Sequence, residues 1–351
     1  MHHLAVFGKP AIQVCAGADE NSAQPVKMRE KEETIRNDPQ LPPATRERIQ
    51  AVAADMGYQR NAAMGELMRQ MRLRGNRKTG ASFALINANA DEQAFVRHPT
   101  LPRYVAGIRR RAEAGGYHLD PFWLHAPGMR PERWREIFAA RGLRGALIVG
   151  MMQEKRLPDT FRGVPEQFPC VVTGLRTEDP ELSYASVDHH ALLHLALREA
   201  RSLGYRRPAL ALSTQLDELV MGRFSAGFRH GVETLYRMSP LPVFDDRRND
   251  GEFLTWFCQT RPDVVLSLFN RPARLIREQR LAAATVQLEL RPEHNDVAGI
   301  DQRNDLVGEA AFDLLVSALL QGETGLPQFA KGVLISPVWR AGESAPMVPV
   351  T

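Results

Sequence analysis

The residues best suited to catalytic chemistry stand side by side at Asp188, His189 and His190. A carboxylate beside two imidazoles can hold divalent cations, which activate water for hydrolysis. That chemistry needs further Asp ligands at the ends of other strands, and none of the expected strands ends in such a cluster. The sequence also has no HExxH, GxSxG, GxGxxG or Walker loop. We therefore expect no catalytic residue, no metal and no cofactor, and we expect Asp188 to cap a helix that begins at His190.

The same Asp-His-His run resembles the motif that names the DHH phosphoesterases, hydrolases that hold two divalent cations. A metal-dependent phosphoesterase therefore stays an alternative, disfavoured because the further ligands are missing from the sequence.

A different kind of chemistry is suggested by the segment 41–72, which has the pattern of one helix followed by a short basic helix. Apolar residues recur at helical spacing before Gly57, and Asn61 can cap the second helix. The apolar stripe of that second helix is Met64, Leu67, Met68 and Met71. Arginines lie beside this stripe, which suits contact with a polyanion.

Segment 41–72 resembles the end of the headpiece and the hinge helix of the LacI/GalR family of bacterial transcription regulators. Gly57-Tyr58 and Asn61-Ala62 stand where that family has Gly-Tyr and Asn-Ala. The resemblance implies that hinge helices of two subunits pair in the minor groove of duplex DNA, with a Leu wedged between base steps. The expected DNA-binding residues are Asn61, Ala62, Leu67, Arg69 and Arg72. The simpler interpretation is an amphipathic linker packed on the body.

Composition is consistent with a multidomain intracellular protein. The 351 residues are 44% hydrophobic and 25% charged, which suits two or three domains. Residues 27–78 carry 12 basic and 7 acidic side chains, so the net charge of +4 is concentrated there. The cysteines are scattered and form no metal-binding spacing, and no apolar run is long enough to span a bilayer. We expect a cytoplasmic protein with no membrane partner.

Beyond residue 78, short apolar runs alternate with amphipathic stretches, a pattern typical of parallel sheets covered by helices. The expected strands include 81–86, 145–150, 169–173, 208–212 and 263–268, with a further strand after Pro337. The expected helices include 102–114, 131–140, 190–203, 223–236, 273–284 and 305–320. The fold class that this alternation predicts is α/β.

The body also resembles the LacI/GalR effector domain in several runs that occur in the family's order. These runs are PRYVAGIRRRAEAGGYHL from Pro102, GLRGALIVG ending at Gly150, YASVDHHALLHLALREARSLGYRRPALAL from Tyr184, MGRFSAGF ending at Phe228, and GIDQRNDLVGEAAFDLLVSALLQGETGLP from Gly299. The resemblance implies two Rossmann-like subdomains of the periplasmic-binding-protein type with three crossovers, preceded by a partial helical headpiece and a hinge helix.

The domain boundaries expected from this resemblance are a headpiece at 1–59, a hinge at 60–79, a first subdomain at 80–187 plus 301–324, and a second at 188–300 plus 325–345. Residues 1–34 do not fit, because they lack the pattern of a helix-turn-helix. A frame error or misplaced start upstream of Arg36, or a real loss of DNA reading, would each explain this.

The resemblance implies a small-molecule effector, by family default a sugar, in the cleft between the subdomains. The expected ligand-binding residues are Arg223, Asn270, Glu289 and Gln302, although Arg223 is displaced by one position relative to Gly227. We place Asp301 and Gln302 in the crossover. For each ligand residue the simpler role is a helix cap or a surface ion pair. The resemblance implies a ligand-responsive, homodimeric transcription regulator that acts as a repressor. A ligand-sensing module that does not bind DNA is the alternative.

Overall fold

The computed structural model describes residue 48 and residues 80–291, 293–294 and 296–349. The chain divides into two compact units, Met1–Gln59 and Arg60–Thr351. Apart from residue 48, the expected headpiece, the hinge helix and the DNA-binding residues (Asn61, Ala62, Leu67, Arg69 and Arg72) lie outside the described residues. The account below concerns the second unit.

The first sheet of this unit is parallel throughout, with the order β10-β5-β4-β3-β1-β2. Its strands are β1 (Ser82–Asn87), β2 (His118–Trp123), β3 (Leu143–Val149), β4 (Cys170–Thr173), β5 (Ser183–Val187) and β10 (Gly332–Ile335). Both faces of the central strands are buried. In β1, Phe83 packs with one core cluster and Ala84 with the other. Burial on both faces explains why these strands are continuous apolar runs rather than alternating ones.

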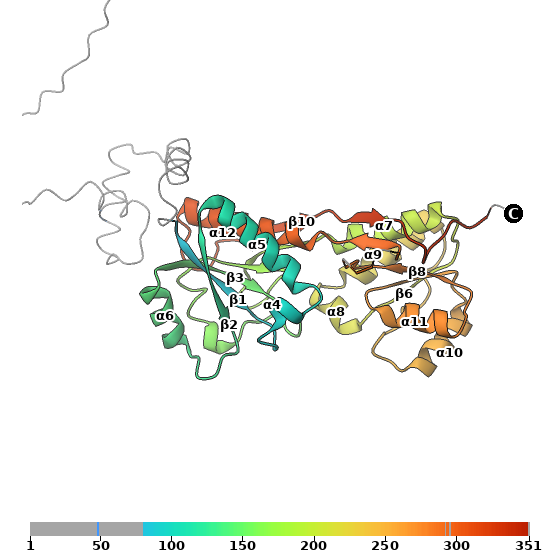
Figure 1. Ribbon diagram of the computed structural model, residues 1–351, viewed down its shortest axis with the longest axis horizontal. Coiled ribbons are helices and arrows are strands. Elements are labelled where there is room, and N and C mark those ends of the chain that lie inside the picture. The colour runs from blue at the N-terminus through green and yellow to red at the C-terminus, as the bar shows by residue number, and fades with distance from the viewer. Residues whose placement is uncertain (1–47, 49–79, 292, 295, 350–351) are drawn as a thin grey trace, which may run out of the picture. The chain divides into compact units, whose positions relative to one another are not determined.

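Helices cover the two faces of this sheet (Figure 1). On one face lie α5 (Leu101–Gly115) and α12 (Asn304–Gln321), and α6 (Pro131–Ala140) packs Trp134 and Phe138 on the other. The short elements α4 (Ala94–Arg97) and η1 (Asp159–Phe161) lie in the connections.

Two glycines allow α5 and α12 to approach closely. A Cβ built on Gly107 of α5 would lie 1.8 Å from the backbone oxygen of Asp305. A Cβ built on Gly308 of α12 would lie 2.2 Å from the backbone oxygen of Tyr104. Backbone therefore packs against backbone at this crossing, which no larger residue permits.

The second sheet has the order β11-β9-β8-β7-β6 and is parallel except for β11. Its strands are β6 (Pro208–Ala211), β7 (Val264–Ser267), β8 (Ala284–Gln287), β9 (Gly299–Asp301) and β11 (Val338–Arg340). One face is covered by α7 (His189–Ser202), α9 (Arg223–Gly231) and the π-helical turn η2 (Val232–Tyr236). The other face is covered by α10 (Asp250–Thr260) and α11 (Asn270–Glu278). The short helix α8 (Thr214–Leu219) precedes α9.

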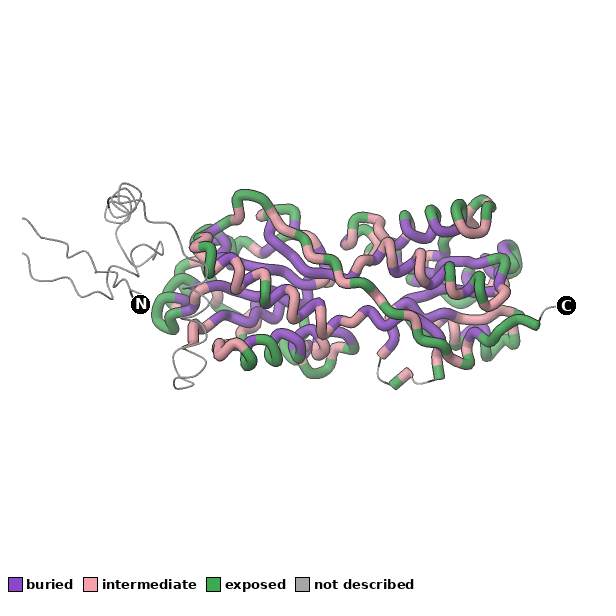
Figure 2. Tube along the Cα trace, turned by 90° about the horizontal axis from the view of Figure 1, so that it is seen from above, coloured by how far each residue is buried: buried purple, intermediate pink, exposed green. Residues whose placement is uncertain are grey.

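Within the described residues the chain passes between the sheets three times: from β5 to α7, from β9 to α12, and from β10 to β11. Figure 2 shows buried residues concentrated in the interior of each of the two lobes that result. An ion pair lies at one crossover, where Arg103 of α5 reaches Asp301 of β9 at 3.1 Å and Arg340 reaches the same carboxylate at 3.0 Å. This architecture confirms the α/β fold class with two Rossmann-like subdomains and three crossovers.

Some segments differ from the sequence expectation. The expected second subdomain included 325–345, whereas β10 pairs with β5 in the first sheet. Asp301 ends β9 rather than lying in the crossover. The helix expected at 273–284 ends at Glu278, and Arg280 follows with a left-handed φ of 51°. That conformation is incompatible with a continuing helix, so the chain turns there into β8.

None of the helices in the described part of the chain combines the length and the apolar composition that crossing a membrane would require.

Candidate functional site

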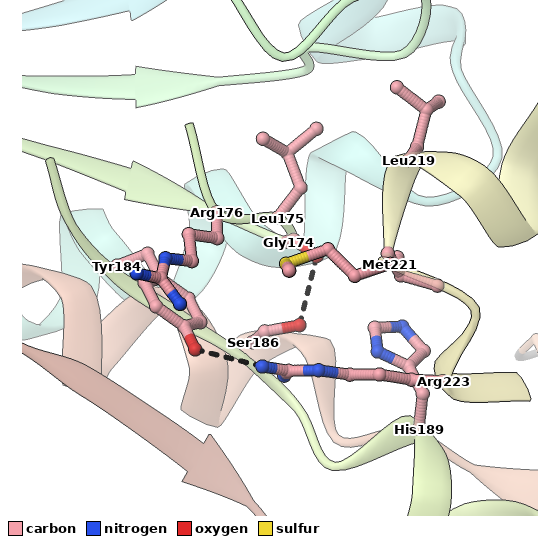
Figure 3. A pocket seen from close by; sticks show the side chains of 10 residues that line it. Gly174, Leu175, Arg176, Tyr184, Ser186, His189, Leu219, Met221 and Arg223 are labelled. Carbon is pink, nitrogen blue, oxygen red and sulfur yellow. Dashed lines mark hydrogen bonds between the residues drawn. The ribbon is translucent and has the colours of Figure 1, made fainter. Parts of the chain in front are cut away.

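A small pocket lies between the two lobes, with a volume of about 10 Å³. Its walls come from the segment after β4, from β5, from the start of α7 and from the α8–α9 turn (Figure 3). The lining residues are Gly174, Leu175, Arg176, Tyr184, Ser186, His189, Leu219, Val220, Met221 and Arg223. The carboxyl end of β4 borders this space, and ligands bind at such ends in open α/β folds.

Arg223 is positioned by an unusual turn. Met221 and Gly222 both have left-handed φ angles, 60° and 69°, so the chain reverses sharply between α8 and α9. The Asp217 carboxylate accepts hydrogen bonds from the backbone N–H groups of Phe224 and Ser225 at 3.1 and 3.2 Å. These contacts hold the start of α9, where Arg223 is the first residue.

The guanidinium of Arg223 crosses the pocket to the other lobe. Its Nη2 donates a hydrogen bond to the Tyr184 hydroxyl at 3.1 Å, and its Cζ lies 6.0 Å from the centre of the Tyr184 ring. Figure 3 shows this contact as a dashed line. Arg223 forms no ion pair with any acidic side chain of the described residues, whereas Arg176, the other arginine of the pocket, pairs with Glu181. The Arg223 charge is therefore free to attract an anion.

His189 forms the floor between these groups. It is 6% exposed, and its ring packs edge-to-face on Phe224 with 4.5 Å between centroids. Burial, aided by the positive charge of Arg223 and opposed by Asp188, lowers the pKa of His189 to about 3. The ring is therefore neutral at physiological pH. Its buried Nδ1 has no hydrogen-bond partner among the described residues.

The Asp-His-His run is used structurally. The Asp188 side chain accepts a hydrogen bond from the backbone N–H of Ala191 at 3.0 Å and caps α7, as predicted, although the helix begins one residue earlier, at His189. His189 points into the pocket floor, and His190 stacks on His230 with 5.3 Å between centroids. In the described part of the chain, His, Cys, Asp and Glu side chains form no group of three that could hold a metal.

Of the four ligand residues expected from sequence, Arg223 lines the pocket and the other three do not. Asn270 is exposed at the start of α11, with its Nδ2 3.3 Å from His294 Nε2. Glu289 accepts a hydrogen bond from Asn304 Nδ2 at 3.0 Å. Gln302 is buried and donates to the Leu288 carbonyl at 2.9 Å. Their role toward a ligand stays a prediction.

Sequence reasoning missed Tyr184, Ser186 and His189 as lining residues. Tyr184 and Ser186 alternate along β5 and so share one side of the strand, a period-two signal that is visible in the sequence. Nothing in the sequence indicates that this side meets the α8–α9 turn, because that contact is made across the lobes.

Several solved structures share this fold. The transcriptional regulator CelR in complex with cellobiose has 18% identity and a TM-score of 0.58, over 89% of this chain and 94% of that one. The lac repressor dimer bound to operator and the anti-inducer ONPF has 16% identity and a TM-score of 0.56, over 91% and 95%. A LacI-family regulator from Enterococcus faecium with bound ribose has 14% identity and a TM-score of 0.55, over 76% and 100%.

No family model matches the sequence, and no curated protein matches it either. The similarity is therefore one of fold, sustained over most of both chains at low sequence identity. The chain has the two-lobed fold of the LacI-family transcription regulators.

Proposed function

We propose that this chain is a ligand-responsive transcription regulator that senses a small metabolite between its two lobes. The observation that supports this most is the pocket itself, because both lobes contribute to it in a fold whose solved examples include regulators bound to sugars and to operator DNA. A ligand that contacts both lobes changes the free energy of their relative arrangement.

The proposed mechanism couples that arrangement to DNA binding. Residues 27–78, with 12 basic and 7 acidic side chains, supply the positive charge for phosphate contacts. A ligand that favours one arrangement of the lobes in a homodimer then changes operator affinity by the coupling free energy, and DNA changes ligand affinity by the same factor. We propose a repressor that works in the cytoplasm, with Arg223 as the ligand residue and with duplex DNA and a second copy of the chain as partners.

Selection of duplex DNA from a random pool by the full chain tests this proposal. We expect one palindromic sequence to be enriched, and its dissociation constant to change by at least about tenfold with one metabolite of a sugar and sugar-acid panel. Light scattering should give a dimer. Failure to enrich any sequence, with or without metabolites, would contradict the regulator function.

A second candidate, a ligand-sensing module without operator reading, is favoured by one observation: residues 1–34 lack a helix-turn-helix pattern. This candidate predicts metabolite binding together with DNA binding that is weak, unselective and strongly reduced by salt. The solved structures of this fold reported above are regulators rather than enzymes, which supports a non-catalytic role.

A further inference from the structure

The pocket between the lobes is lined by two arginines and, in the described part of the chain, by no acidic residue. Among the ten described residues that line it are two arginines and a histidine, with no aspartate and no glutamate. Glu181, which is not a lining residue, pairs with Arg176. Arg223 is left as a half-buried cation without a carboxylate partner among the described residues.

A guanidinium withdrawn from water loses hydration that an ion pair would replace. Arginine has five N–H donors, arranged to match two oxygens of a carboxylate or phosphate. In the described structure the Arg223 side chain donates one hydrogen bond, to Tyr184, so other donors remain for a ligand. A neutral sugar hydroxyl would use them without compensating the charge.

His189 supplies an independent observation. Its Nδ1 is buried without a partner in the described structure, and the residue, which is 6% exposed, lines the same pocket. An unsatisfied buried polar atom destabilises the folded protein unless something binds to it. The neutral tautomer with a proton on Nδ1 is a donor, and an anionic oxygen is the acceptor that it fits.

From this geometry we infer that the pocket binds an acidic group of the effector, a carboxylate or a phosphate, with Arg223 as its ion-pair partner and His189 as a hydrogen-bond donor. The inference rests on the proposed function, since it assigns a chemical class to that effector. With about 10 Å³, the pocket has room for about one water in this arrangement of the lobes, so the lobes must separate to admit the acidic group of a metabolite, such as that of a sugar acid or sugar phosphate.

Inorganic phosphate is the probe for the first experiment, with its ³¹P line width followed as the full chain is added at constant ionic strength. Thermal shifts are unsuitable because phosphate stabilises most proteins by exclusion from their surface. We expect saturable broadening with the wild type and at least about tenfold weaker binding with Arg223→Gln. Arg223→Lys keeps the positive charge and should bind phosphate with an affinity between those of the wild type and Arg223→Gln.

The matched control is Arg229→Gln, which removes the same charge from an exposed site on the same helix. It should bind phosphate as the wild type does. Equal broadening in wild type and Arg223→Gln, or no saturable broadening in the wild type, would overturn the inference. Circular dichroism of each variant identifies any that fails to fold. If Arg223→Gln does not fold, phosphate binding by Arg223→Lys is compared with that by Arg229→Gln, and equal binding by the two would overturn the inference.

A second experiment compares acidic sugars with a neutral one, and so distinguishes a carboxylate from a phosphate as the acidic group. Gluconate and glucose 6-phosphate are each compared with glucose by calorimetry, and we expect one acid to bind more tightly than glucose in the wild type but not in Arg223→Gln. Tighter binding of glucose, unchanged in Arg223→Gln, would exclude an acidic effector yet leave the regulator function standing. The regulator function is tested separately, by the DNA selection described above.

Discussion

The positive charge of Arg223 acts on His189, which lines the same pocket. The arginine charge opposes protonation of the imidazole, and burial does so more strongly. Both effects keep His189 neutral, so the pocket presents the Arg223 cation, which has no ion-pair partner among the described residues, together with a neutral donor. An incoming anion would reverse the electrostatic part of this balance and raise the pKa of His189.

The lowered pKa of His189 predicts how stability depends on pH. The unfolded chain binds a proton near pH 6.5 and the folded chain only near pH 3, so stability is full above pH 6.5 and falls as pH decreases between these values. One such group contributes up to about 1.4 kcal/mol per pH unit. Urea unfolding at pH 7 and pH 5 should show a smaller loss in His189→Gln than in the wild type.

The exposed His118 on β2 provides the control for this comparison. His118→Gln should keep the wild-type pH dependence. Identical slopes in the wild type and His189→Gln would mean that His189 is not the buried neutral group described here.

At this scale the sequence predicted the roles that depend on neighbours along the chain. Asp188 caps α7 because a carboxylate at that position reaches the first backbone N–H groups. Arg223 was predicted to line the pocket through family resemblance. The unpartnered Nδ1 of His189 could not be predicted, because it depends on which side chains surround the ring in the folded protein.

At the scale of elements, the α8–α9 turn determines where Arg223 points. Gly222 has φ +69°, and a Cβ added to it would have its nearest neighbour, Ser225 Oγ, at 3.7 Å. Space is therefore available, and the cost of Gly222→Ala is the left-handed backbone alone, roughly 1–2 kcal/mol. Urea denaturation should measure that loss. Met221→Asn, which tolerates the same conformation, should cost little, and equal effects of both changes would contradict this explanation.

The α5–α12 crossing should respond much more strongly to a methyl group. Gly107→Ala brings a Cβ to 1.8 Å from a backbone oxygen, and neither helix can yield without moving its own core. We expect a loss of at least about 2 kcal/mol. Gly163→Ala is the control, because its Cβ would meet no atom closer than 3.7 Å. Similar melting temperatures for the two variants would show that the helices separate easily.

Sequence predicted the apolar central strands better than the outer ones. The expected strand at 145–150 corresponds to β3, where both faces are buried. The edge strand β2, HLDPFW, mixes charge and Pro121 and is only partly buried, so no apolar run marks it. Its pairing with β1 comes from tertiary contacts.

At the scale of the whole molecule, the alternation of strands and helices predicted the α/β class, and the order of the family-like runs predicted two lobes with three crossovers. The final assignment of residues 332–335 to the first sheet was missed, since composition does not indicate which of two sheets a short edge strand joins.

The Arg103–Asp301–Arg340 cluster connects the lobes at a crossover, so it bears on the whole molecule. Burial favours the neutral form of Asp301, but the Arg303 backbone N–H and the two guanidiniums outweigh it and lower its pKa. Asp301→Asn should therefore destabilise the protein at pH 7 by roughly 1–3 kcal/mol, an effect that shrinks as pH falls below the ordinary carboxyl range. Unfolding experiments at pH 7 and pH 3.5 test both statements.

Asp313→Asn removes a carboxylate from a surface pair with Arg111, both side chains being about half exposed. It should change stability by less than about 0.5 kcal/mol. If both variants lose the same amount, the crossover cluster contributes no more than a surface ion pair.

The positions of β10 and β11 have a consequence for synthesis of the protein. Each lies at one edge of a different sheet, beside β5 and β9, and the two are separated by a two-residue link. The ribosome synthesises the other strands of these two sheets first. Each lobe therefore lacks one edge strand until the same short stretch of chain has been made. Until residue 340 emerges, the edges of β5 and β9 stay uncovered and available to chaperones or to aggregation. One late premature stop would thus leave both lobes unfinished at once.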